Sequence, residues 1–541
     1  MDRRHFLQQT VMGAASLSTV TPAFGQSPLA QEPQRISSAT LTTGDEVVER
    51  SVDDLRRALE TGQLTARALT QSYLRRIDAV DRQGAGVNSV IELNPDALEI
   101  AERLDIERKA GRVRGPLHGI PVLIKDNIDT ADRMKTTAGS LALVDAHPLL
   151  DAGIVGRLRE AGAVLLGKTN LSEWANFRSD NSTSGWSGRG GLTRNPYALD
   201  RNACGSSSGS GAAAAASLCA VAVGTETDGS IICPSSRCGL VGIKPTVGLV
   251  SRSGIIPISA TQDTAGPMAR TVADAATLLQ VLAGPDQRDP ATKGQTLAQD
   301  YRQYLQPDAL QGKRIGVMRN FFGFDARVDA LMEAAIKAIE AAGATIVDKA
   351  NLPTKGQFGD AEMQILLHEF KAGVREYLTT LGPSAPMKTL ADLIAFNEAH
   401  AKDELPYFGQ ELFIKAQAKG PLTDKVYLSA KAKAERLSRT EGLDRVFALK
   451  KVDAQLAPSG GPAWLTDLVN GDYGTGGSSG PAAVSGYTSI TVPAGFVRGL
   501  PVGVSFIGPA WSEARLIGIA YAYEHATKMR RAPQFLPSAL V

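Results

Sequence analysis

The 541-residue sequence contains no run of about 18 or more apolar residues, so it predicts no ordinary transmembrane helix. It also lacks an excess of either charge, because 58 basic and 56 acidic side chains leave a net charge of +2. Nucleic-acid-binding proteins normally show a strong basic excess, so no nucleic-acid partner is expected. The low hydrophobicity of disordered chains is absent too: 43% of the residues are hydrophobic, which suits a large buried core.

Cysteine is scarce, and its spacing excludes the usual zinc sites. The four cysteines are Cys204, Cys219, Cys233 and Cys238, with no C-x-x-C pair and no histidine nearby. The sequence therefore predicts no metal site. An exported chain could join these cysteines in two disulfides, but their apolar or Gly/Ser/Ala-rich surroundings favour buried free thiols.

The first 25 residues differ from the rest of the chain. Arg3 and Arg4 precede Phe-Leu, and a mildly apolar stretch then ends at the small residues Ala23-Phe24-Gly25. This arrangement resembles a twin-arginine export signal; the alternative is a frayed basic terminus. We predict a signal over residues 1–25, read by the twin-arginine export machinery through Arg3 and Arg4, and a periplasmic or secreted protein. Residues 26–45 are polar without an apolar period, which predicts a linker.

Residues 46–541 predict one large catalytic unit, because no fixed-period repeat or long linker divides them. Its N-terminal part carries three helical patterns. These are the cap-like Ser51-Val-Asp-Asp54, the helical spacing of Leu69, Tyr73, Ile77 and Val80, and a third helix opened by Asn94-Pro95 and closed by Gly111.

From about residue 120 onwards, short apolar runs alternate with helical patterns. Strands are predicted at Ile120–Ile124, Ala163–Leu166, Ser489–Pro493 and Val502–Ile507, and helices at Ile154–Ala161 and Ser512–Thr527. This rhythm predicts an α/β fold with a large mixed or mostly parallel sheet, covered by helices on both faces. Residues 325–450 are richer in helical pattern and charge, for example at Ala361–Leu378, and predict a helical excursion that forms a wall of the substrate site.

A serine-rich segment, Cys204–Gly211, precedes the alanine run Ala212–Ala216. Runs of Gly and Ser usually form flexible linkers, but linkers are not normally followed by an alanine run and a strand. The segment therefore predicts a tight loop leading into a close-packed helix, with hydroxyls and amides at the helix N-terminus.

Residues 205–209 also match the G-x-S-x-G elbow of α/β-hydrolases, whose mechanism needs a downstream histidine. The downstream histidines are His368, His400 and His525. The first two lie in charged, helical surroundings, which disfavours this class of enzyme.

A further serine, Ser230, lies in the turn Thr225–Pro234, which follows the apolar run Val221–Val223. A serine in a Gly-containing turn can supply a nucleophile while neighbouring backbone amides converge on one point. Asp-Gly-Ser is also a common structural turn, so this motif alone does not establish a catalytic role.

Lys125 at the end of a buried strand, the Ser206 loop and the Ser230 turn together resemble the amidase signature family, the Ser-cisSer-Lys hydrolases. The resemblance runs from about residue 50 to 530. Its motifs are Pro116–Asp129, Leu166–Asn170, the two serine segments, Gly242–Thr246, Ile490–Gly495 and Gly499–Gly503. Within the family, the motifs are most similar to the bacterial peptide-amidase branch.

The sequence departs from the family's common motifs in both serine segments. The loop G-G-S-S-G-G-S has Cys204 first and Ser208 fifth, and the turn D-x-G-G-S-I-R has Glu226, Asp228 and Ile232 where Asp, Gly and Arg are usual. Three adjacent serines leave Ser207 as an alternative to Ser206. The spacing to Ser230, which is that of the family, favours Ser206.

The resemblance implies a catalytic triad of Lys125, Ser206 and Ser230. Ser230 is then the nucleophile, and Ser206, preceded by a cis peptide bond from Gly205, relays its proton to a neutral Lys125 whose pKa is lowered by burial. The implied oxyanion hole consists of the backbone N–H groups of Thr227, Asp228, Gly229 and Ser230. No cofactor is implied.

The implied activity is hydrolysis of a carboxamide to an acid and ammonia, by a monomer or homodimer acting on a small-molecule or peptide amide. The same triad could act on aryl amides, esters or carbamates. Two less favoured alternatives are a tRNA-dependent amidotransferase subunit, which the export signal and near-neutral charge disfavour, and a non-catalytic periplasmic binding protein.

Overall fold

The computed structural model describes residues 45–295 and 300–539. The predicted export signal at 1–25 and all but the last residue of the predicted linker at 26–45 lie outside these ranges. Within them, no helix has both the length and the apolar character needed to span a membrane.

The predicted N-terminal helices form. The helix α1 (Val52–Glu60) begins after Ser51, whose hydroxyl accepts the Asp54 N–H at 3.1 Å while the Asp54 carboxylate accepts the Ser51 N–H. Next, α2 (Ala66–Arg76) and the π-helical segment Ile77–Gln83 that continues it bury all four predicted apolar positions. The third helix, α3 (Ala97–Lys109), ends close to the predicted Gly111. Local caps and periodicity therefore suffice to place these helices.

An 11-stranded sheet crosses the described residues in the order β1-β3-β2-β8-β10-β9-β14-β15-β13-β11-β12. The strands are β1 (Val90–Leu93), β2 (Pro121–Lys125), β3 (Val164–Thr169), β8 (Val221–Glu226), β9 (Val241–Lys244), β10 (Thr264–Ala269), β11 (Arg314–Val317), β12 (Thr345–Val347), β13 (Ala454–Pro458), β14 (Thr488–Val497) and β15 (Leu500–Gly508). Parallel pairing is restricted to β2 with β3 and β8, and to β11 with β12 and β13. The other strand pairs of this described sheet are antiparallel. The sheet is therefore mixed, as predicted, but it is not mostly parallel.

Hairpin geometry explains part of this difference. Only Arg498 and Gly499 separate β14 from β15, and both residues have positive φ angles, 51° and 78°. Two consecutive left-handed residues suit the tight turn of a two-residue hairpin, which forces its strands to run antiparallel. An apolar run in the sequence predicts a strand but does not give its direction relative to its neighbours.

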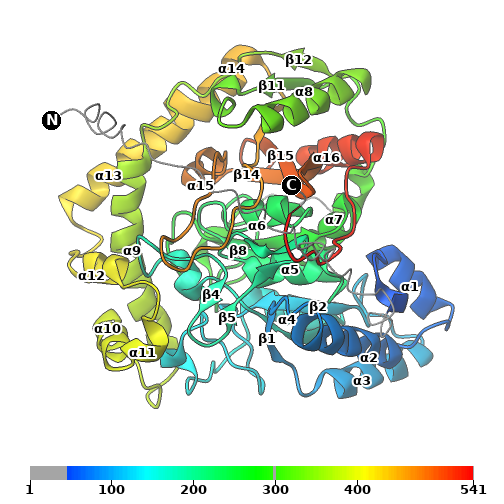
Figure 1. Ribbon diagram of the computed structural model, residues 1–541, viewed down its shortest axis with the longest axis vertical. Helices are drawn as coiled ribbons and strands as arrows, with labels where there is room; N and C mark the ends of the chain where they lie inside the picture. Colours follow the sequence, from blue (N-terminus) through cyan, green and yellow to red (C-terminus); the bar gives the residue numbers. More distant parts are fainter. Residues whose placement is uncertain (1–44, 296–299, 540–541) are drawn as a thin grey trace, which may run out of the picture. The chain divides into compact units, whose positions relative to one another are not determined.

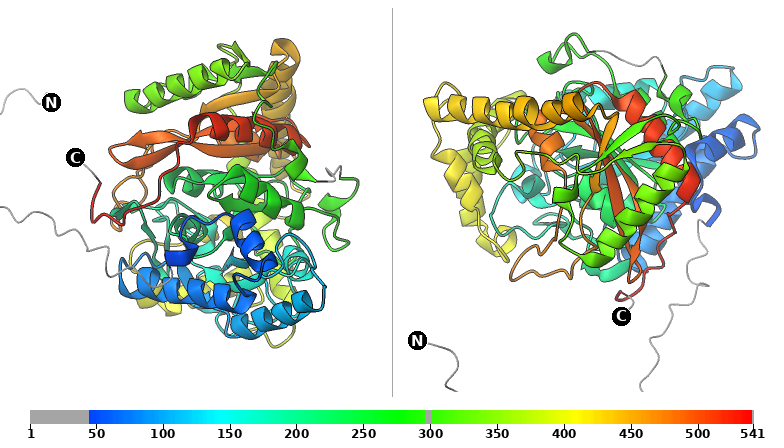
Figure 2. Two further views of the ribbon diagram at one scale, coloured as in Figure 1. Left: turned by 90° about the vertical axis from the view of Figure 1, so that its right-hand side faces the viewer. Right: turned by 90° about the horizontal axis from the view of Figure 1, so that it is seen from above.

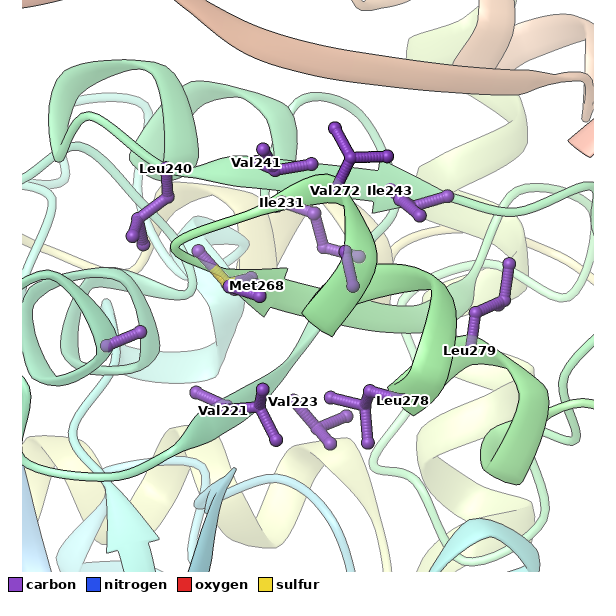
Figure 3. Packing of buried hydrophobic residues seen from close by; sticks show 14 of the residues in the cluster. Val221, Val223, Ile231, Leu240, Val241, Ile243, Met268, Val272, Leu278 and Leu279 are labelled. Carbon is purple, nitrogen blue, oxygen red and sulfur yellow. The ribbon is translucent and has the colours of Figure 1, made fainter. Parts of the chain in front are cut away.

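Helices cover both faces of the sheet, as predicted (Figure 2). On one face, β8 meets the start of α5 (Ser208–Ala215) and β9 meets α6 (Ile232–Arg237). On the other face, α7 (Val272–Leu282) packs on β9 and β10 and contacts α16 (Glu513–Thr527). Figure 3 shows side chains of β8 and β9 gathered around α7 in the main hydrophobic core.

The predicted helical excursion at 325–450 is mainly helical, but it also contributes to the sheet. It comprises α8 (Ala326–Ala341), β12, α9 (Gly359–Thr380), α10 (Leu390–Ala399), α11 (Ala401–Glu404), α12 (Glu411–Gln417), α13 (Lys425–Glu435) and α14 (Asp444–Lys450). The strand β12 extends the sheet edge, and α8 packs on β14. The helices α9, α10 and α12, which Figure 1 shows on one side of the molecule, share a second core with the segment after β3. In this core, Trp174 and Phe370 contact Phe413.

Candidate active site

Lys125 is the last residue of β2 and is fully buried between β3 and β8. Its ammonium nitrogen lies 2.8 Å from the Ser206 hydroxyl and 2.9 Å from the Thr225 hydroxyl. The Asn127 amide donates to the same Thr225 oxygen at 3.0 Å. The structure thus holds the lysine beside the first of the two predicted serine segments by hydrogen bonds to neutral groups.

Ser206, rather than Ser207, is the serine beside Lys125. The Ser207 hydroxyl instead donates to the Thr225 carbonyl at 3.0 Å and accepts the Thr225 N–H at 3.1 Å, which ties it to the backbone of β8. The Gly205–Ser206 peptide bond is cis, as the resemblance implied. After this loop, α5 is buried along its whole length. A Cβ on Gly209 would come within 2.4 Å of the Asn170 carbonyl oxygen, so the helix depends on its small residues and is not a flexible linker.

The Ser230 turn connects β8 to α6. The Glu226 carboxylate accepts the N–H groups of Ile231 at 2.7 Å and Ile232 at 2.9 Å, so it caps the start of α6. Gly229 has a φ of +80°, a backbone conformation that favours glycine. Within the described residues, the four predicted oxyanion donors, the N–H groups of Thr227, Asp228, Gly229 and Ser230, form no hydrogen bond to protein. These donors are therefore available to an external oxygen.

Ser230 lies in the same region, but among the described residues no hydrogen bond joins it to the other two predicted triad residues, Lys125 and Ser206. It is 9% exposed, and its hydroxyl forms no hydrogen bond to another described side chain. Its carbonyl accepts the Ser207 N–H at 3.3 Å, which joins the Ser230 turn to the Ser206 loop.

Burial dominates the electrostatics of Lys125. Removal of the ammonium from water lowers its pKa from 10.5 to about 7, although the charges of Asp263 and Glu226 act in the opposite direction. Asp263 accepts the Thr227 hydroxyl at 2.6 Å, and burial raises the pKa of Asp263 to about 6. The lysine is therefore partly neutral near neutral pH, as a general base requires.

A second pair of ionisable groups lies at the oxyanion turn. The Asp228 carboxyl contacts Glu362 of α9, and burial together with the neighbouring carboxyl raises the pKa of Glu362 well above its usual range. Gln262 donates to Glu362 at 3.0 Å and to the Thr227 carbonyl at 3.3 Å, so this pair is linked to the turn. Asp228 itself is exposed, and it lines a cavity.

Two cavities flank the Ser230 turn. The larger, about 680 Å³, is lined by Thr225 and Thr227 of the turn, by apolar residues such as Ile256, and by Tyr377 of α9. The smaller, about 350 Å³, is lined by Gly205, Asp228 and Gly229. Neither lining includes the Ser206 or Ser230 side chain. The size of a cavity therefore does not single out the predicted triad residues, and the N–H groups without a protein partner lie on the turn that borders both cavities.

The family comparison agrees with this geometry. The family described as Amidase matches residues 68–517. The chain belongs to the amidase signature family. A probable amidase of Arabidopsis thaliana is 41% identical over 513 residues, covering 92% of this chain and 94% of the relative.

Solved structures give the same result. The native peptide amidase from Stenotrophomonas maltophilia is 53% identical, with a TM-score of 0.86, over 90% of this chain and 98% of that one. A peptide amidase in complex with the competitive inhibitor chymostatin gives a TM-score of 0.88 at the same identity, over 90% of this chain and 99% of that one. The protein is thus an amidase-family hydrolase with the fold that the resemblance implied.

The cysteines require a correction. Cys204 and Cys233 form a disulfide, with Cα atoms 6.0 Å apart, so the prediction of free thiols is wrong for these two. It is right for Cys219 and Cys238, which are free and buried, and burial raises the pKa of each thiol to about 12. The disulfide joins two segments 29 residues apart that the implied proton relay already brings together, but the sequence did not show that their cysteines are paired.

The sequence patterns did not predict several residues that contact the candidate site. Asn127 lies in the family motif Pro116–Asp129 and Thr225 opens the Ser230 turn, so their motifs could have predicted a place beside Lys125. Glu362 of α9 and Gln262, which precedes β10, carry no local signal, because each reaches the turn only through the tertiary fold. Of the histidines weighed for a hydrolase mechanism, His368 and His400 bond to backbone carbonyls of their own helices. Among residues 45–295 and 300–539, no cluster of metal-binding side chains is present.

Proposed function

We propose that this amidase hydrolyses a carboxamide to a carboxylic acid and ammonia through an ester on Ser230, and that C-terminal peptide amides are its substrate class. The observation that carries the proposal is the 2.8 Å contact between the buried Lys125 amine and the Ser206 hydroxyl. This contact pairs a base of lowered pKa with a hydroxyl relay, close to a serine turn whose backbone N–H groups are free.

In the proposed reaction, the Ser230 oxygen attacks the amide carbonyl carbon, and its proton passes through Ser206 to neutral Lys125. The N–H groups of residues 227–230 stabilise the oxyanion that forms. When the C–N bond breaks, the proton returns through Ser206 to the leaving nitrogen, which departs as ammonia. Water then attacks the Ser230 ester with the same proton relay, and the acid is released.

Similarity to solved peptide amidases supports the peptide-amide substrate class. The polar cavity at Gly205 and Gly229 is consistent with it, because it adjoins both serine segments and offers room for a residue beside the scissile amide. The larger cavity, which is mainly apolar, offers space for a side chain or a second residue.

A substrate panel tests this specificity. We expect kcat/KM for N-acetyl amino-acid amides to exceed that for simple aliphatic amides, anilides, phenyl esters and carbamates by at least about tenfold, because contacts beyond the reacting group are recognised only in the amino-acid amides. Ammonia release, or release of the corresponding alcohol or aniline, measures each rate. A higher kcat/KM for an anilide, ester or carbamate would assign the same machinery to that bond instead.

We also propose that residues 1–25 direct export through the twin-arginine machinery. The disulfide supports this, because such bonds persist mainly in oxidising compartments. The variant carrying Arg3→Lys and Arg4→Lys should remain in the cytoplasm, whereas the parent should be recovered outside it with an N-terminus near residue 26. Cell fractionation and intact-mass measurement check both points. Equal export of variant and parent would contradict the signal.

A further inference from the structure

The Cys204–Cys233 disulfide joins the two segments that carry the candidate serines. Cys204 lies two residues before Ser206, and Cys233 lies three residues after Ser230, in the first turn of α6. Both cysteines line the 350 Å³ cavity. The disulfide therefore links the loop that carries the proposed relay serine, Ser206, to the turn that carries the proposed nucleophile, Ser230.

Cys204 adopts a backbone conformation that is unusual for a residue with a side chain. Its φ is +60°, in the left-handed region that favours glycine, and glycine is usual at this position of the common amidase loop. The backbone N–H of Cys204 is held by the Asn202 side chain at 2.7 Å. A cysteine at such a position needs a compensating interaction, and the bond to Cys233 provides one.

Ser207 supplies hydrogen bonds between the two segments, because its hydroxyl bonds to the backbone of Thr225, the first residue of the Ser230 turn, at 3.0 and 3.1 Å. The Ser206 loop is fixed to its own surroundings, for example by the Ser172 N–H, which the Ser206 carbonyl accepts at 3.0 Å. Between the Ser206 loop and the Ser230 turn, the Ser207 N–H also donates to the Ser230 carbonyl at 3.3 Å, a long hydrogen bond. The disulfide is the covalent restraint on the separation of the two serines.

The disulfide is also placed for thiol exchange. Cys204 and Cys233 border the cavity and Cys233 is partly exposed, whereas Cys219 and Cys238 are fully buried. An Arg237 nitrogen lies 2.8 Å from the Cys233 sulfur. A cation at this distance stabilises a thiolate, so Cys233 is the better leaving group when a thiol attacks the Cys204 sulfur.

We propose that the Cys204–Cys233 disulfide is a redox-responsive positioning element that keeps the Ser206 loop and the Ser230 turn in the arrangement needed for proton relay. The proposal rests on the proposed amidase mechanism. A dithiol reductant opens the element: one thiolate attacks Cys204, the S–S bond breaks, and Cys233 leaves as a thiolate. The second thiol of the reagent then displaces Cys204 and leaves as a cyclic disulfide, so two electrons pass to the protein.

Steady-state kinetics on an N-acetyl amino-acid amide test this role. Reduction of the parent with dithiothreitol should lower kcat by about tenfold or more, with a smaller change in KM, because a misplacement of about 1 Å can cost about 10²-fold in rate. Treatment with oxidised glutathione should restore kcat. The double variant Cys204→Gly, Cys233→Ala should show the low kcat under both conditions.

A matched double variant separates the disulfide from the other two cysteines. Cys219→Ala with Cys238→Ala removes the buried thiols, and this variant should respond to dithiothreitol as the parent does. Native alkylation followed by mass measurement should then show two modified cysteines only after reduction.

Two results would overturn the positioning role. One is an equal kcat in the oxidised and reduced parent at complete reduction. The other is a lower melting temperature with unchanged kcat at the assay temperature, which would make the bond a stabilising crosslink alone. An oxidised parent without activity on any carboxamide would instead contradict the proposed function, so the two failures are distinguishable.

Discussion

Replacement of Ser230 by alanine is expected to reduce kcat on a peptide amide by on the order of 10⁶, the loss seen when a serine nucleophile is removed from a triad. The relay through Ser206 and the oxyanion donors remain in the variant, but no atom is left to form the ester. Initial-rate measurements of ammonia release, with enzyme concentrations raised for the variant, check the prediction. Residual activity within tenfold of the parent would remove Ser230 from the mechanism.

Stability and a second serine provide the controls for this variant. Because the Ser230 hydroxyl bonds to no other described side chain, Ser230→Ala should melt within about 3 °C of the parent. Ser235 of α6 offers a matched substitution, since it is buried and its hydroxyl has no partner among the described residues. Ser235→Ala should keep parental kcat. A comparable loss in both variants would indicate a general disturbance of α6.

Features governed by local sequence could be predicted. The Ser51–Asp54 cap and the helical spacing from Leu69 to Val80 define their helices through interactions within a few residues. The same holds for the strand that ends at Lys125, because a short apolar run followed by polar residues is a local pattern. The direction of each strand relative to its neighbours does not follow from the local sequence. The pairing of β10 with β8 and β9 depends on which strands become neighbours, so the sequence left a mixed and a mostly parallel sheet open, and the structure shows the mixed one.

In the candidate site, too, residues within local motifs were predicted and contacts made by the tertiary fold were not. Lys125 and Ser206 were predicted from motifs, and the structure brings them to 2.8 Å of each other. The disulfide was not predicted, because the apolar or Gly/Ser/Ala-rich surroundings of the cysteines favoured free thiols, although the implied relay brings its two segments together. The contact of Asp228 with Glu362 was not predicted, because only the tertiary fold brings α9 to the turn. Asp228 departs from the common turn, and its carboxyl makes the contact with Glu362 that the motifs did not predict.

The pH dependence of catalysis should depend on Lys125. Only the neutral amine can accept the proton from Ser206, and burial lowers the pKa of Lys125 to about 7. In the parent, kcat/KM should therefore rise with pH through about 7, since the protonated lysine below this pH has no capacity to act as a base. Lys125→Ala should lose this ascending limb together with most activity. Rate profiles between pH 5 and 9 are the measurement.

Two further measurements assign that limb to the lysine. The ascending limb should persist after single replacements of His118, His147, His368, His400 and His525. If one of these variants lost the limb while Lys125→Ala stayed active, a histidine would be the general base instead. Unfolding in denaturant gives an independent readout, because the unfolded lysine keeps its proton up to its ordinary pKa of 10.5, whereas the folded one releases it near 7. Between these values the unfolded state binds more protons, so the parent's free energy of unfolding should increase as the pH rises. Lys125→Met has no proton to bind in either state and lacks this gain, so its stability relative to the parent should be greatest below pH 7 and decline towards pH 10.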